Sequence, residues 1–181
     1  MATTIGRVLR DRNAGLYLTA VVVSGFGSSA MALVSGIWVK ELTGSDGLAA
    51  LCTLALWAPL LLGPLLGTLA DRTRRRPLLV AVNVGLGVLL LPLLWVDRVG
   101  GAAGLGLLFA VLVVYGACGV VTDAAEAALV AGAVGKDLLA DLNGLRMSAN
   151  EGMKLLAPVA GAAVFTAWGG PRVALLDAVT F

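Results

Sequence analysis

Long uncharged stretches, separated by short polar segments, dominate the pattern of this chain. Residues 14–39, 48–70 and 77–96 contain no charged side chain, and residues 102–131 contain only two, both acidic and both in the last third. A helix needs about 20 apolar residues to cross the hydrocarbon core. A membrane-spanning strand would instead alternate between apolar and polar positions over about ten residues. The pattern therefore predicts spanning helices at these four stretches.

Two further helices are expected after these four. The fifth covers about 145–168 and follows a polar connection at 132–144, while a sixth begins near 172 and reaches the last residue of the sequence after about ten positions. Ten residues are roughly half a span. We therefore predict an all-α integral membrane fold, a single N-terminal bundle over residues 1–181 whose sixth helix is truncated, and we expect the chain to be a fragment of a longer protein.

Composition supports a membrane protein and excludes several classes of enzyme. Of the 181 residues, 59% are hydrophobic and only 13% are charged, whereas soluble domains are about 25% charged. The sequence contains no histidine, and Cys52 and Cys118 each lie inside an apolar stretch. We found no phosphate-binding loop, nucleophile motif or metal-ligand spacing. We therefore expect no enzymatic activity, no cofactor and no metal, and the short basic loop anchored at the membrane does not predict nucleic-acid binding.

The distribution of basic residues predicts the orientation in the membrane. Nine basic residues lie on one side of the predicted topology and three on the other, with the thirteenth inside a span. The nine are Arg7, Arg10, Arg12, Arg72, Arg74, Arg75, Arg76, Lys136 and Arg146. Because basic residues concentrate on the cytoplasmic side, we expect the N-terminus to be cytoplasmic. The predicted location is the cell membrane, as a multi-pass protein of the bacterial inner membrane.

The loop between the second and third helices carries a specific motif. It reads Gly67-Thr68-Leu69-Ala70-Asp71-Arg72-Thr73-Arg74-Arg75-Arg76. This run resembles the signature G-x-L-a-D-r-x-G-r-[kr] of the major facilitator superfamily, in the same loop and on the same side. One position differs, because Arg74 replaces the usual glycine. The alternative is an ordinary cluster of basic residues that stops transfer across the membrane.

The resemblance implies a fold, an activity and a role for the loop. The chain would be the N-terminal six-helix half of a transporter that works by alternating access, and a C-terminal six-helix half would be its partner. Within the family, the aspartate of this loop and its neighbours latch the two halves together in the outward-facing state. The residues implied for this conformational latch are Gly67, Asp71, Arg72, Arg75 and Arg76.

A weaker resemblance lies in the fifth helix. Exporters of the superfamily often carry G-P-x-x-G-G there, and this chain keeps Pro158 and Gly161 with alanine at the other two positions. Other segments are similar to the branch that contains bacterial drug, siderophore and macrolide exporters. The alternative for Pro158 is a helix kink that the neighbouring helices tolerate.

Four ionisable residues inside the fourth and fifth helices form a candidate charge cluster. Asp123 and Glu126 are three residues apart and share a helix face, as do Glu151 and Lys154. If the two pairs face each other, three acids meet one lysine, and at least one carboxyl group is a candidate to hold a proton. The alternative is a structural ion-pair cluster close to the lipid headgroups.

These features together predict secondary active transport. The expected function is proton-coupled efflux of a hydrophobic or amphipathic small molecule, bound near the middle of the lipid bilayer between the two halves. The alternative is a half-length membrane module for binding or assembly, without transport, that dimerises through close-packing glycine faces at Gly63/Gly67 or Gly116/Gly119.

Overall fold

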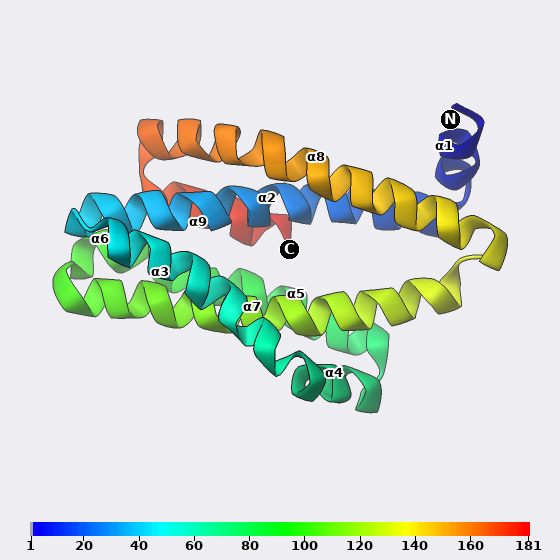
Figure 1. The fold of residues 1–181 in the computed structure, drawn as a ribbon, viewed down its shortest axis with the longest axis horizontal. Coiled ribbons are helices and arrows are strands. Elements are labelled where there is room, and N and C mark those ends of the chain that lie inside the picture. Colours follow the sequence, from blue (N-terminus) through cyan, green and yellow to red (C-terminus); the bar gives the residue numbers. More distant parts are fainter. Residues whose placement is uncertain (1) are drawn as a thin grey trace.

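The protein is a bundle of long helices (Figure 1). Helix α2 (Arg12–Thr43) and the extensively packed α8 (Lys136–Trp168) run in the same direction, whereas α5 (Arg75–Leu90) and α7 (Gly101–Ala133) run in opposite directions. The computed structural model describes residues 2–181, without the side chains of residues 2–4, 69, 71 and 136. Helices cover almost all of the described residues, and these residues form no strand. The all-α expectation is therefore confirmed.

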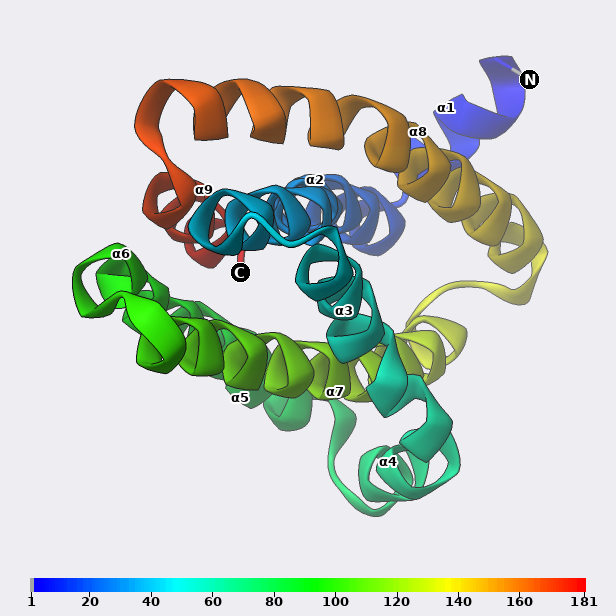
Figure 2. The same ribbon diagram turned by 60° about the vertical axis from the view of Figure 1, so that its left-hand side comes forward.

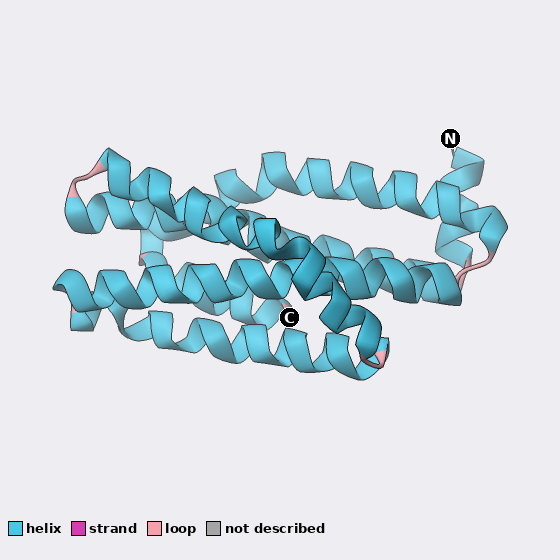
Figure 3. Cartoon of the chain, turned by 60° about the horizontal axis from the view of Figure 1, so that its bottom comes forward, coloured by secondary structure: helices cyan, strands magenta, loops and turns pink. Residues whose placement is uncertain are grey.

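The helix bounds differ from the predicted ones in detail. The elements are α1 (Ala2–Arg10), α2 (Arg12–Thr43), α3 (Asp46–Trp57), η1 (Ala58–Leu62), α4 (Gly63–Arg72), α5 (Arg75–Leu90), η2 (Leu91–Trp95), α6 (Val96–Val99), α7 (Gly101–Ala133), α8 (Lys136–Trp168) and α9 (Gly170–Thr180). In Figure 3, only short loops separate these helices.

Four helical segments are long and apolar enough to cross a membrane: Arg12–Thr43, Asp46–Thr68, Arg75–Val99 and Gly101–Ala133. They correspond to the first four predicted helices. Helix α8 has 33 residues but is more polar, and α9 has 11 residues. The six-helix count therefore remains a prediction.

Prolines interrupt the second and third spanning segments. The 3₁₀ segments η1 and η2 contain Pro59 and Pro92 at their first turns, and α4 begins with Pro64 in its first turn. A proline inside a helix removes one hydrogen bond and its ring clashes with the carbonyl one turn back. The local change to 3₁₀ pairing is the response to this conflict. The sequence prediction treated both segments as uninterrupted.

The predicted polar connection at 132–144 is wrong for most of its length. Only Val134 and Gly135 separate α7 from α8, and α8 begins at Lys136 rather than near 145. Leu138, Leu142 and Leu145 recur at helical spacing and pack into one apolar cluster. The polar residues between them occupy the other faces of the same helix.

Helix α1 was not predicted, and it packs on the end of the bundle. Val8 is fully buried in the same cluster as Leu142, together with Ala14 from α2 and Val130 from α7. An ion pair of 3.1 Å between Arg7 and Asp141 attaches α1 to α8. The first residues of the chain therefore cover one end of the molecule.

The packing of the helices leaves a separation that holds the site. Helix α2 packs extensively on α8, α3 and α9, while α5 packs on α7. Contacts of α7 with α2 and α8 are few. Figure 2 shows α2 and α8 on one side of this separation and α5 and α7 on the other. The main apolar core, which includes Met31, Leu90 and Leu112, joins the two sides toward the other end of the bundle.

Candidate functional site

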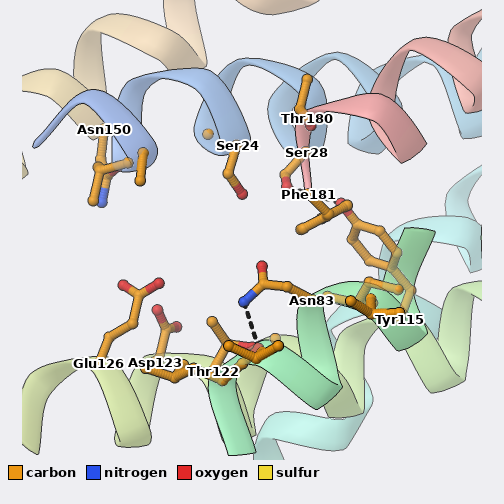
Figure 4. A pocket seen from close by; sticks show the side chains of 18 of the residues that line it. Ser24, Ser28, Asn83, Tyr115, Thr122, Asp123, Glu126, Asn150, Thr180 and Phe181 are labelled. Carbon is orange, nitrogen blue, oxygen red and sulfur yellow. Dashed lines mark hydrogen bonds between the residues drawn. The ribbon is translucent and has the colours of Figure 1, made fainter. Parts of the chain in front are cut away.

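A cavity of about 560 Å³ lies between these two sides of the bundle. Its wall is part apolar, with valine, leucine and alanine side chains, and part polar. The polar residues are Ser24 and Ser28 of α2, Asn83 of α5, Tyr115, Thr122, Asp123 and Glu126 of α7, Arg146 and Asn150 of α8, and Thr180 of α9 (Figure 4). A mixed wall of this kind suits a small amphipathic ligand.

Two carboxylates of the candidate charge cluster line the cavity. Arg146 donates to Asp123 Oδ1 over 3.3 Å, and the Tyr17 hydroxyl donates to Glu126 Oε2 over 3.3 Å. The structure therefore brings Asp123 and Glu126 to one face, as predicted, and Figure 4 shows both side chains directed toward the opening. Among the described residues that line the cavity, Arg146 is the one cation beside these two acids, so this part of the wall is acidic.

The other half of the predicted cluster lies elsewhere. Glu151 and Lys154 pair with each other over 2.7 Å, and their side chains are 65% and 59% exposed. Neither lines the cavity, where α8 instead presents Arg146 and Asn150. The expectation that the two acidic and basic pairs face each other is therefore wrong, because the register of α8 turns Glu151 and Lys154 outward.

Two polar atoms in the cavity wall have no hydrogen-bond partner among the described residues. These are Thr122 Oγ1 and Arg146 Nε, and both are buried. Buried polar groups are almost always hydrogen-bonded. Water or a ligand in the cavity could satisfy them.

Asp177 is a polar residue of the site whose importance the sequence did not reveal. Its side chain is fully buried. Its Oδ2 lies 2.9 Å from the Tyr115 hydroxyl, which lies 2.8 Å from Ser28 Oγ. An acid in the otherwise apolar run 173–179 was the available signal.

The predicted latch lies at the turn between α4 and α5. Arg72 ends α4, and Arg75 begins α5, where its guanidinium donates to the Ala128 carbonyl of α7 over 2.9 Å. Arg76 is exposed, and a Cβ added at Gly67 would meet nothing within 4 Å. The side chain of Asp71 lies outside the described residues.

The motif of the fifth helix lies within α8. Pro158 lies inside the helix, and Gly161 is buried against α2, where an added Cβ would come within 2.8 Å of Ala30 Cβ. Gly161 therefore permits close packing of α2 and α8. Neither residue lines the cavity.

The glycine faces proposed for dimerisation have different environments. A Cβ at Gly116 would overlap the Leu56 carbonyl, so this glycine is already used inside the chain. A Cβ at Gly63, Gly67 or Gly119 would meet nothing within 4 Å.

The four long apolar helices are those of a multi-pass helical membrane protein. A family described as Major Facilitator Superfamily matches residues 16–181, which is most of the chain. No curated protein and no solved structure gives a match. The chain belongs to the major facilitator superfamily, whose members are transporters and generally not enzymes.

Proposed function

We propose that this chain forms the N-terminal bundle of a transporter that exports a hydrophobic or amphipathic small molecule in exchange for protons. The observation that carries the proposal is the cavity, whose wall combines apolar side chains with the carboxylates of Asp123 and Glu126. Asp123 forms an ion pair with Arg146, whereas Glu126 makes no ion pair and is hydrogen-bonded only by Tyr17 among the described residues. Glu126 is therefore the carboxylate of this pair that we propose to exchange a proton.

Alternating access requires a second bundle, which we propose as a C-terminal half that completes the binding site. The turn of Gly67, Asp71, Arg72, Arg75 and Arg76 would then act as the latch between the halves. The position of this turn supports a latch role. Arg75 donates a hydrogen bond to the carbonyl of Ala128 in α7, only two residues beyond Glu126. Movement of the latch could in this way reach the acidic wall of the cavity.

The proposal is tested by efflux from cells that express the full-length protein. We expect Glu126→Gln and Asp71→Asn each to reduce proton-dependent efflux of a hydrophobic dye at least tenfold. Glu41→Gln is the matched control, because Glu41 is exposed at the end of α2, away from the cavity. Efflux that persists in both test variants, or that ignores the proton gradient in the wild type, would contradict the mechanism.

One observation favours the alternative of an assembly module. The α4 face around Gly63 and Gly67 is open, and the neighbouring Leu61 and Leu65 are 85% and 69% exposed. Small residues on such a face allow close helix association in a membrane. Cysteine crosslinking at Leu65 between copies of the chain, together with absence of transport, would support the module instead of the transporter.

A further inference from the structure

Two hydrogen-bonding side chains, Tyr115 and Ser28, connect the buried carboxyl group of Asp177 with the cavity. The Tyr115 hydroxyl lies within hydrogen-bond distance of both Asp177 Oδ2 and Ser28 Oγ, at 2.9 and 2.8 Å. Asp177 is fully buried, whereas Ser28 and Tyr115 line the cavity. The three side chains come from α9, α2 and α7, so the connection depends on the packing of all three helices.

The surroundings of Asp177 contain no compensating cation among the described residues. The Thr180 hydroxyl is 2.7 Å from the Asp177 carbonyl oxygen and 3.4 Å from Asp177 Oδ1, so it is a weak second donor to the carboxylate. Gly27 of α2 lies against the carboxylate. Tyr115 is the titratable group that faces it.

The charged side chains of the neighbouring helices make no ion pair with Asp177. In the described part of the chain these are Arg12, Lys40 and Glu41 of α2, Arg75 and Arg76 of α5, Asp123 and Glu126 of α7, Asp137, Asp141, Arg146, Glu151 and Lys154 of α8, and Arg172 of α9. An ionisable group enclosed in a membrane bundle without a charged partner is a typical member of a proton relay.

The connection can exist in two polarities, because each hydroxyl carries one proton. When Asp177 is ionised, Tyr115 donates to it and Ser28 donates to Tyr115, so Ser28 offers lone pairs to the cavity. When Asp177 holds a proton, it donates to Tyr115, Tyr115 donates to Ser28, and the Ser28 proton is free to point into the cavity.

We propose that Asp177, Tyr115 and Ser28 form a relay in which a proton on Asp177 converts Ser28 from a hydrogen-bond acceptor into a donor at the cavity wall. A ligand with an amine, ammonium or hydroxyl donor then binds the form with ionised Asp177. Its binding releases the Asp177 proton to the solvent, and protonation releases the ligand. The relay rests on the proposed proton exchange and adds a ligand class to it.

The first test measures the proton on Asp177 without any ligand. Infrared difference spectra of the purified full-length protein, between acidic and alkaline buffer, report the C=O stretch of protonated carboxyl groups. We expect Asp177→Asn to lose one such band, and Tyr115→Phe and Ser28→Ala to shift its frequency. Asp46→Asn is the matched control, because Asp46 is an exposed acid near the end of α2, and it should leave the band unchanged.

A band that persists in Asp177→Asn would overturn the relay. If the band is lost in Asp177→Asn but does not shift in Ser28→Ala, Asp177 holds the proton without a connection to the cavity, and the relay is wrong. Asp177→Glu guards against loss of folding, because it keeps a carboxyl group and should keep a shifted band.

The second test compares two hydrophobic cations. Ethidium carries two amine donors, whereas tetraphenylphosphonium carries none. We expect the affinity for ethidium to fall at acidic pH by up to about tenfold per pH unit, the limit for one exchanged proton. In Ser28→Ala, the affinity for ethidium should depend on pH no more than the affinity for tetraphenylphosphonium does. Equal pH dependence for both cations, or no binding of either, would contradict the ligand class.

These tests separate the relay from the proposed function. If the Asp177 band titrates but efflux by the wild type ignores the proton gradient, the hydrogen-bonded connection exists but the proposed proton exchange, and with it the transport role of the relay, fails. If efflux depends on protons but the band does not belong to Asp177, the relay alone fails.

Discussion

The three carboxylates near the cavity differ in what surrounds them. Asp123 pairs with Arg146, Glu126 accepts a hydrogen bond from Tyr17, and Asp177 is enclosed with Tyr115 as its hydrogen-bond donor. The Asp123 side chain is 77% exposed, whereas Asp177 is fully buried. Removing the charge should therefore change the free energy of the protein more at Asp177 than at Asp123, because neither water nor salt screens a buried charge.

Gly27 is the residue that allows α9 to place Asp177 in this position. A Cβ there would overlap the side chains of Asp177 and Thr180 and come within 3.1 Å of the Asp177 Cα. We therefore expect Gly27→Ala to destabilise the bundle by about 1–3 kcal/mol, the typical cost of overpacking. Gly25→Ala is the control on the same helix, because its Cβ would meet only ordinary contacts at 3.7 Å and beyond.

The measurement is the thermal unfolding midpoint in detergent. A lower midpoint for Gly27→Ala, with Gly25→Ala close to wild type, is the expected result. Equal midpoints for the two variants would show that α9 moves freely away from α2.

Part of the site could be predicted from the sequence at this scale. Spacing placed Asp123 and Glu126 on one helix face, because a three-residue separation fixes the face whatever packs against it. Spacing could not determine what that face meets. The roles of Arg146 and Tyr115, and the burial of Asp177, depend on the angles at which α2, α7 and α9 pack. Those angles follow from long-range packing that one helix does not encode.

Close contact between helices in this bundle depends on a few glycines. Gly116 brings α7 against the backbone of α3 at Leu56, and Gly161 brings α8 against Ala30 of α2. Without water to drive association, van der Waals contact between backbones is a main source of helix affinity. The glycines that face neighbours should therefore be intolerant of substitution, and those that do not should tolerate it.

Helix α7 offers a matched pair for this prediction. Gly116→Ala should destabilise the protein by about 1–3 kcal/mol, because its Cβ would overlap the backbone of Leu56. Gly119→Ala should be neutral or stabilising by up to about 1 kcal/mol, since alanine favours helix and nothing lies within 4 Å. Thermal unfolding of both variants measures the difference. A loss of stability in Gly119→Ala comparable to that in Gly116→Ala would contradict the contact with α3.

The sequence predicted the four apolar helices well but misplaced the start of α8. Runs without charge are an unambiguous signal, because the lipid core requires them. The first turns of α8 mix Asp137, Asp141 and Asn143 with leucines, and polarity suggested a loop. In this segment the helical spacing of the leucines was a better indicator of structure than the polarity of the residues between them. These leucines pack into the apolar cluster to which Val8 of α1 also belongs. The sequence of α8 alone does not reveal that partner.

Helix α1 provides a test of that cluster. Val8 is fully buried, whereas the adjacent Leu9 is 57% exposed. We expect Val8→Asp to detach α1 from the bundle, since it buries an unpaired charge, and Leu9→Asp to leave it attached. Limited proteolysis near residue 10 reports detachment. Cleavage at equal rates in both variants would mean that α1 does not rest on this cluster.

The whole molecule presents an apolar side surface and two differently charged ends. Leu61, Leu155 and Val159 are each more than two-thirds exposed, as suits a surface in contact with lipid and not water. The chain reverses direction at alternate ends of the long axis (Figure 1). Arg7 and Arg10 belong to α1, and Arg12 begins α2, at the end of the long axis where α1 lies (Figure 1). This asymmetry predicts that α1 and the start of α8 face the cytoplasm.

Accessibility of introduced cysteines tests the orientation. Ala140 is exposed near the start of α8, and Gly47 is exposed at the start of α3. In a background of Cys52→Ala and Cys118→Ala, a membrane-impermeant maleimide should label Gly47→Cys in intact cells. It should label Ala140→Cys only after permeabilisation, because the excess of nine basic residues over three predicts that this end faces the cytoplasm. Labelling in the reverse pattern would contradict the predicted orientation, because the start of α8 would then face the outside of the cell.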